Sequence, residues 1–190
     1  MEVGFCQLID LILCGSFGGV VKPFEIILDQ ARWGELNLPE FMKRNNKDAR
    51  EPEIDEFAKA LRSQYKRVGA IGFCFGGPLV FRLGAKDRNL VDCISAAHPS
   101  FLEKREIAKV GVPVQIIAPE IDPLYTPELK SYSHEVIPTL GVPYDYQHFP
   151  GLEHGFGTRG DIKIDKERDG MLRAKNAAVL WFRQWLHDDK

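Results

Sequence analysis

The chain has 190 residues, of which 44% are hydrophobic and 27% charged, with 17 glycines and 12 prolines. This length suits one globular domain with a sizeable core and excludes two full catalytic domains. The balance of residue types argues against a collagen-like, disordered or coiled-coil chain. Lys and Arg number 25 against 27 Asp and Glu, a net charge of -2. With no basic excess to bind phosphates, nucleic acid is not expected as a partner.

The first 50 residues carry the weakest structural signals. The stretch 3–21 is fairly apolar, but Glu2 replaces the basic start of a signal peptide and Asp10 interrupts the run. We therefore expect neither a signal peptide nor a membrane span, and we predict a cytoplasmic protein with no membrane partner. The stretch 5–14 fits a strand or a helix, and 23–33 fits a short helix.

From about residue 50 onward, helical and strand patterns alternate with short Gly or Pro breaks, which is typical of a parallel α/β sheet. The expected strands are 68–73, 91–97, 112–118 and 144–149, and the expected helices are 51–65, 78–84, 103–109, 127–140 and 165–187. The polar stretch 45–52 predicts a surface loop, and 150–161 predicts a Gly-rich loop. No linker divides the chain, so we predict a single domain over 1–190, with a mostly parallel sheet flanked by helices.

The four cysteines, Cys6, Cys14, Cys74 and Cys93, are irregularly spaced and include no CxxC pair. Neither a zinc site nor a disulfide framework is predicted from this spacing. Reduced thiols are the simpler interpretation.

The segment GFCFGG at 72–77, between a predicted strand and a predicted helix, has the form of a nucleophile elbow with Cys74 in the place of serine. Such a turn strains the backbone of the nucleophile, and small residues such as Gly72 and Gly76 prevent a clash between strand and helix. The sulfur would lie at the N-terminus of a helix, where the dipole favours thiolate over thiol. The Phe75 N–H is then expected to be one oxyanion donor. A buried structural cysteine is the alternative.

An elbow of this kind needs an acid and then a base, each in the loop after a later strand. Asp122 follows the third predicted strand, with Glu120 as its competitor, and His154 follows the fourth. These placements favour a Cys74–Asp122–His154 triad. His98 also follows a strand and could line the pocket, although a structural role is favoured for it.

Several segments resemble the dienelactone hydrolase family, in particular its fungal branch. They are VGAIGFCFGG at 68–77, AAHPSF at 96–101, APEIDPLYTPE at 118–128 and FPGLEHGFGTRGD at 149–161. The resemblance runs from about residue 35 to the end and implies an α/β-hydrolase-like fold. It also implies a triad at Cys74, Asp122 and His154, and a substrate-facing arginine just after the histidine, which here is Arg159.

The N-terminal part departs from the family pattern, because residues 1–34 do not match it. Three explanations stay open: a reduced N-terminal part, pairing of this part with another subunit, or a shortened product of the gene. The second oxyanion donor stays open, with 16–19 as one candidate loop. So does the acidic partner of the cysteine, with Glu2, Asp10, Glu25 and Asp29 as candidates.

The predicted activity is hydrolysis of small esters or lactones through a thioacyl-enzyme, with no cofactor and no metal. Two other hypotheses remain. One is a catalytically weak, hydrolase-like binding protein, and the other is an isomerase or thioesterase in polyketide tailoring. The expected partner is a small-molecule ester or lactone, and the expected state is a monomer or a homodimer.

Overall fold

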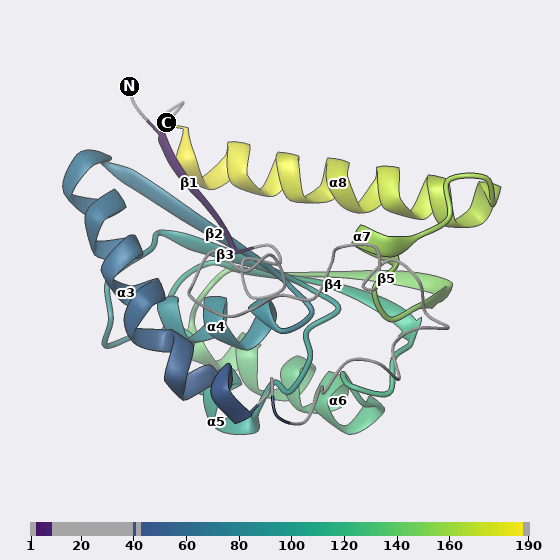
Figure 1. Ribbon diagram of the computed structural model, residues 1–190, viewed down its shortest axis with the longest axis horizontal. Helices are drawn as coiled ribbons and strands as arrows, with labels where there is room; N and C mark the ends of the chain where they lie inside the picture. The colour runs from purple at the N-terminus through teal and green to yellow at the C-terminus, as the bar shows by residue number, and fades with distance from the viewer. Residues whose placement is uncertain (1–2, 9–39, 41–42, 188–190) are drawn as a thin grey trace.

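The computed structural model describes residues 3–8, 40 and 43–187. Within these ranges, one sheet has five strands in the order β1-β2-β3-β4-β5, all parallel to their neighbours (Figure 1). The strands are β1 (Val3–Leu8), β2 (Arg67–Phe73), β3 (Cys93–Ala97), β4 (Val114–Ile121) and β5 (Tyr144–Glu153). The predicted mostly parallel α/β sheet is confirmed.

The helices cover both faces of this sheet. They are α3 (Lys47–Gln64), α4 (Gly76–Leu83), α5 (Lys104–Ile107), α6 (Pro127–Val136, continued by a 3₁₀ turn at Ile137–Leu140), α7 (Phe156–Arg159) and α8 (Asp165–Leu186). Figure 1 shows α8 along one face, with α3, α4, α5 and α6 on the opposite side. Since both faces are covered, the inner strands β2, β3 and β4 are buried along most of their length and are largely apolar.

The alternation of side chains along β2 divides the core into two layers. Val68 and Ala70, both 0% exposed, belong to the cluster packed against α3 and α4. Ile71 points the other way and packs with Trp181 and Phe182 of α8. A two-residue period places successive side chains on opposite faces, so one strand supplies both layers.

The stretch 45–52 is not a surface loop as predicted, because α3 already begins at Lys47. Asn46 caps this helix: its side-chain oxygen accepts a hydrogen bond from the Ala49 N–H at 3.0 Å. Pro52 lies inside the helix. The charges that suggested a loop instead face a set of opposite charges on neighbouring elements.

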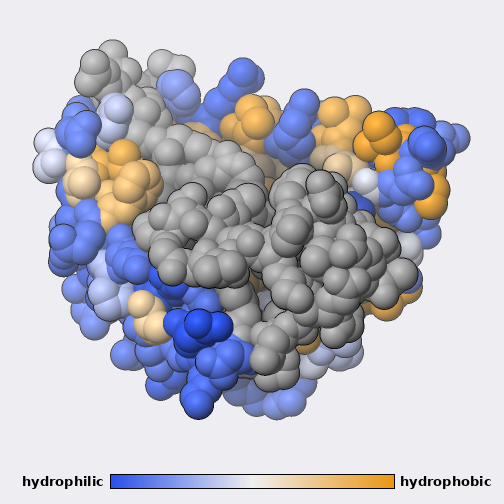
Figure 2. All heavy atoms as spheres, in the orientation of Figure 1, coloured by the Kyte–Doolittle hydropathy of each residue, from blue (hydrophilic) through white to orange (hydrophobic). Residues whose placement is uncertain are grey.

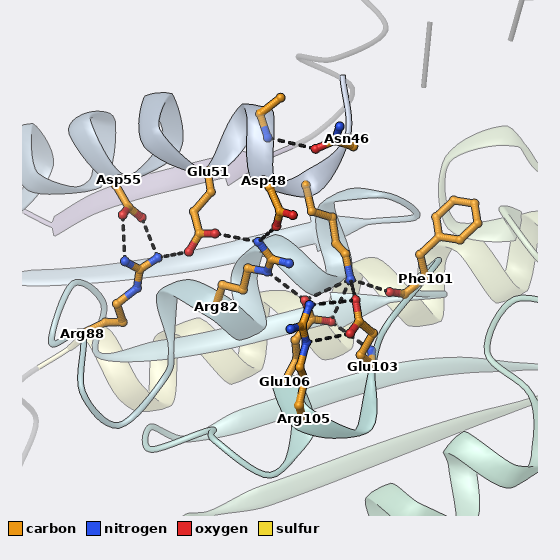
Figure 3. A network of polar contacts seen from close by, with 12 residues as sticks. Asn46, Asp48, Glu51, Asp55, Arg82, Arg88, Phe101, Glu103, Arg105 and Glu106 are labelled. Carbon is orange, nitrogen blue, oxygen red and sulfur yellow. Dashed lines mark hydrogen bonds and ion pairs between the residues drawn. The ribbon is translucent and has the colours of Figure 1, made fainter. Parts of the chain in front are cut away.

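Those charges form a network that joins α3 to α4 and α5 (Figure 3). Arg82 of α4, only 13% exposed, pairs with Asp48 at 2.8 Å, Glu51 at 2.6 Å and Glu106 at 2.8 Å. Lys47 Nζ donates to the Phe101 carbonyl at 2.9 Å and pairs with Glu106 at 3.0 Å. The start of α3 is thereby tied to the segment that follows β3.

The region after β5 also differs from the expected loop. β5 continues to Glu153, and the short helix α7 follows at Phe156–Arg159. Gly155, with φ of 87°, separates the two elements in a conformation that favours glycine. β5 is longer than its apolar part because its last residues still pair with β4. The hydrophobic pattern of the sequence alone does not predict this pairing.

The outer surface of α8 and the segment before it carry several exposed hydrophobic side chains. Ile162, Ile164, Leu172, Val179 and Leu180 are exposed large hydrophobic side chains. Figure 2 shows orange patches over α8 separated by hydrophilic side chains. Among the described helices, none is both long and apolar enough to cross a membrane. The choice between monomer and homodimer stays a prediction.

Candidate active site

Cys74 occupies a strained turn between β2 and α4. Its φ is 46°, a conformation that L-residues rarely adopt. A Cβ on Gly72 would lie 2.2 Å from the Gly76 carbonyl oxygen, so only glycine allows the strand and helix to approach this closely. The Cys74 N–H donates to the Ala97 carbonyl at 3.2 Å, and the Cys74 carbonyl accepts from the Ser100 N–H at 2.8 Å. The turn therefore has the predicted elbow geometry and is held by the segment after β3.

The helix that follows the elbow places backbone donors near the sulfur. Phe75 is the N-cap residue of α4. Because the first N–H groups of a helix have no intrahelical carbonyl partner, this end can stabilise negative charge. The position of Phe75 suits the predicted role of oxyanion donor, and that role stays a prediction.

Asp122 and His154 form a tightly bonded pair. Asp122, at the end of β4, accepts hydrogen bonds from the N–H groups of Leu124 at 2.9 Å and Tyr125 at 3.0 Å. His154 Nδ1 lies 2.9 Å from both carboxylate oxygens of Asp122. The carboxylate therefore fixes the orientation of the ring and leaves Nε2 toward the site.

The surroundings favour a charged His154. Burial alone would lower its pKa, but the hydrogen bond with Asp122 and the interaction with Cys74 raise the pKa to about 9. Burial would raise the pKa of Asp122, but the bonds from His154, Tyr125 and Leu124 outweigh it and lower that pKa. When a histidine base takes a proton from a nucleophile, it becomes an imidazolium. A neighbouring carboxylate, such as Asp122, stabilises that charged state.

His98 lies closer to the Cys74 sulfur than the sequence indicated. Its Nδ1 lies 3.3 Å from Cys74 Sγ, and its ring is 5.2 Å from that of His154. The residue is 0% exposed, which agrees with a structural role, but it also contacts the sulfur directly. Its burial fits the favoured structural role, and its contact with the sulfur fits the alternative that it lines the site.

Ser100 is a further site residue that the sequence reasoning missed. Its Oγ lies 3.3 Å from His154 Nε2, and the residue is buried. The signal was present in the AAHPSF segment, because residues directly after a parallel strand collect at the same sheet edge as the elbow.

His98 differs from His154 in its charge state. Burial, with help from the nearby charge of His154, lowers the pKa of His98 to about 3. Its Nε2 finds no hydrogen-bond partner among the described residues. A neutral imidazole and a charged one therefore both lie close to the sulfur.

The remaining candidates, Arg159 and Glu120, contact the segment around His154. Arg159 is exposed on α7, and its guanidinium packs over Gly155, where an added Cβ would be 2.6 Å from Nη2. Glu120 accepts from the Gly151 N–H at 2.5 Å, so Asp122 and not Glu120 bonds to the base. Arg159 is thus near the site, and its substrate-binding role stays a prediction.

Some sequence candidates fall outside the described residues. These are the possible oxyanion loop at 16–19 and the acidic residues Glu2, Asp10, Glu25 and Asp29.

An apolar pocket of about 430 Å³ adjoins the site between the sheet and α8. Phe73 and Gly157, which line it, also contact His98: the two rings are 5.8 Å apart, and a Cβ on Gly157 would lie 3.0 Å from His98 Nε2. The pocket is therefore behind the buried histidine and does not lie over the Asp122–His154 pair.

Comparisons with known proteins identify the family of the chain. The model of the dienelactone hydrolase family matches residues 28–186. "Hydrolase tropI" of Talaromyces stipitatus is 30% identical over 197 aligned residues, which cover 98% of this chain and 73% of that protein. "Hydrolase pyvD" of Aspergillus violaceofuscus is 34% identical over 124 residues, covering 64% of this chain and 49% of that protein. The likeness to the Talaromyces protein extends into residues 1–34, which the recognisable motifs did not reach.

Solved structures share the fold at low sequence identity. A Klebsiella pneumoniae structure described as a dienelactone hydrolase has a TM-score of 0.65 and 16% identity, and the match covers 96% of this chain and 86% of that one. A dienelactone hydrolase-like promiscuous phosphotriesterase from metagenomic libraries has a TM-score of 0.62 and 18% identity, with 90% and 72% covered. These likenesses support the α/β-hydrolase architecture. The family match over residues 28–186 and the 30% identity to the Talaromyces protein show that the chain belongs to the dienelactone hydrolase family.

Proposed function

We propose that this hydrolase cleaves small esters or lactones with Cys74 as nucleophile, His154 as acid and base, and Asp122 as the residue that orients His154. The observation that carries the proposal is the bonded Asp122–His154 pair beside a cysteine in a strained turn. The ligand atoms of Cys74, His98 and His154 all lie within 4.8 Å of one another, so sulfur and imidazole are close enough for proton transfer after a small adjustment.

The proposed reaction begins when His154 holds the proton of Cys74 and the thiolate attacks the ester or lactone carbonyl carbon. The carbonyl π bond opens, and the resulting oxyanion accepts a hydrogen bond from the Phe75 N–H. When the carbonyl re-forms, the C–O bond to the alcohol breaks and His154 gives its proton to the leaving oxygen. A thioester on Cys74 remains.

Water completes the cycle. His154, now neutral, takes a proton from a water molecule, which attacks the thioester carbon and releases the acid and the thiolate. Because a thiolate is a good leaving group, this route suits activated esters and lactones better than amides. Arg159 is proposed to bind a carboxylate of the substrate, since its planar donors match that group.

The test compares the wild type with Cys74→Ala on an activated aryl ester and on a cis-dienelactone. We expect Cys74→Ala to lower kcat by about 10³-fold or more, as loss of a nucleophile does in other hydrolases. The matched control is Cys93→Ala, because Cys93 is a free, buried cysteine that pairs with Gly69 near the start of β2, whereas the elbow follows the end of that strand. Equal rates for wild type and Cys74→Ala would contradict the proposal, and the absence of turnover by the wild type would favour a binding protein.

The role of Arg159 has a separate readout. Arg159→Gln should raise KM for an acidic lactone and leave KM for an uncharged aryl ester nearly unchanged. An equal change for both substrates would argue against carboxylate recognition by this residue.

A further inference from the structure

We propose that Cys74, His98 and His154 bind zinc or a similar soft divalent transition-metal ion, and that the bound ion inhibits the enzyme. The binding part of this inference depends only on the positions of the three side chains. The inhibition part rests on the proposed function, because it requires Cys74 and His154 to be catalytic.

The donor atoms are already gathered at the spacing of a metal site. Cys74 Sγ and His98 Nδ1 are 3.3 Å apart, and one ligand atom from each of the three residues lies within 4.8 Å of the others. Ligands of tetrahedral zinc, with bonds of about 2.0 to 2.3 Å, are separated by distances of this order. Only small side-chain adjustments are needed to close the site around an ion.

The supporting contacts also match those of known metal sites. A metal-bound histidine usually gives its other ring N–H to a carboxylate, which fixes the ring and strengthens it as a ligand. Asp122 holds His154 Nδ1 at 2.9 Å in this way, which leaves Nε2 for the ion. Because Asp122 itself accepts two backbone N–H bonds, the orientation is well determined.

The donor set selects the class of ion. One sulfur and two imidazole nitrogens suit Zn²⁺, Co²⁺ or Cd²⁺, whereas Mg²⁺ and Ca²⁺ prefer oxygen ligands. Three protein ligands leave a fourth position for water. Cys74 and His154 are partly exposed, so an ion has access from solvent.

Binding would disable the two groups that the proposed reaction uses. The ion takes the thiolate and two neutral imidazoles as ligands, and the proton shared by Cys74 and His154 leaves to solvent. The sulfur lone pair and His154 Nε2 are then occupied by the ion and cannot act on a substrate. A chelator that removes the ion restores both groups.

The experiment is a titration of the reduced, full-length, metal-free protein with Co²⁺, followed by absorption spectroscopy. We expect a thiolate-to-cobalt charge-transfer band and the strong visible bands of four-coordinate cobalt, saturating at one ion per chain. Zn²⁺ should displace the cobalt, and Mg²⁺ should not. Weakly absorbing cobalt without a thiolate band would overturn the proposal.

Variants assign the ligands. Cys74→Ser should remove the charge-transfer band, and His98→Asn should weaken Co²⁺ binding by about 100-fold or more, since changes to supporting residues alone cost about 10- to 100-fold. Asparagine is chosen because His98 has a φ of 37°, which asparagine tolerates. His148→Gln is the matched control, because His148 is exposed on β5 and lies outside the cluster.

The outcomes separate this inference from the proposed function. Undiminished binding by Cys74→Ser or His98→Asn would overturn the metal site whether or not the protein hydrolyses esters. If the protein binds Co²⁺ as expected and hydrolyses neither substrate, the proposed function fails while the binding site stands. If it is active, submillimolar Zn²⁺ should inhibit the wild type, with recovery in EDTA. Full activity with the site occupied by zinc would overturn the inhibition.

Discussion

The loops after β3 and β5 each bring a histidine to Cys74, but they give it opposite properties. His98, in the first loop, is fully buried, and burial lowers its pKa to about 3. His154, in the second, overcomes burial through its bond with Asp122, and its pKa rises to about 9. The comparison teaches that burial keeps an imidazole neutral unless a bonded carboxylate and other favourable contacts outweigh it.

The two loops are also held differently. The first contains strained residues, His98 with φ of 37° and Phe101 with φ of 59°, and is tied to α3 by Lys47. The second is an extension of the sheet, in which the His154 N–H donates to the Ile121 carbonyl at 3.0 Å. A strained loop with a neutral histidine (the neutral side) and a sheet-supported loop with a charged histidine (the charged side) therefore meet at the sulfur.

The largest expected effect comes from the charged side. We predict that His154→Gln lowers kcat/KM for the aryl ester by about 10²- to 10⁴-fold, because the proton acceptor and donor is lost. Steady-state kinetics with protein of confirmed fold checks this. A loss smaller than that caused by His98→Asn would reverse the assignment of the two histidines.

The second prediction removes the carboxylate and keeps its shape. Asp122→Asn should lower the pKa of His154 from about 9 toward its ordinary 6.5, because the bond that raises it is weakened. Since the imidazolium must protonate the leaving oxygen, the alkaline limb of the pH–rate profile should lie near pH 9 in the wild type and shift to lower pH in the variant. An unshifted limb would show that Asp122 does not control the charge of His154.

The same two histidines predict the pH dependence of stability. Because the pKa of His154 is raised in the folded state, the stability that its protonation adds is fully present below about pH 6.5 and is lost as pH rises through 9. The lowered pKa of His98 acts oppositely: the unfolded chain binds the extra proton, so stability is lost as pH falls below 6.5. Urea unfolding across pH should show Asp122→Asn flattening the alkaline side and His98→Asn flattening the acid side.

A smaller effect is expected from the neutral side. His98→Asn removes one hydrogen bond to sulfur, worth roughly 1 kcal/mol or about a fivefold change in rate. We expect this loss in kcat, with little change in KM. A loss as large as that of His154→Gln would mean that His98 itself transfers the proton.

The last prediction concerns the support of the first loop. Lys47→Met removes the donor to the Phe101 carbonyl and one partner of buried Glu106, and should cost about 1 to 3 kcal/mol of stability. Amide hydrogen exchange should increase in 98–103 and not in 150–155. Equal exchange changes in both loops would show that they open together.

Much of the fold was predictable because apolar periodicity reports burial directly. The strands β2, β3, β4 and β5 and the long final helix lie close to their expected positions. The start of α3 was missed, because a charged helix face that pairs with other elements looks like a solvated loop in sequence. Only the contacts of Asp48, Glu51 and Arg82 show the difference.

For the site, the local sequence determined the elbow, since Gly72 and Gly76 are required at fixed spacing around Cys74. It also placed Asp122 and His154 after strands that end at the same sheet edge. It did not determine which histidine is charged, that His98 and Ser100 contact the site, or that three residues from separate loops form a metal-like donor set. Those properties depend on distances and burial across the sheet edge, and these exist only when distant segments are packed together.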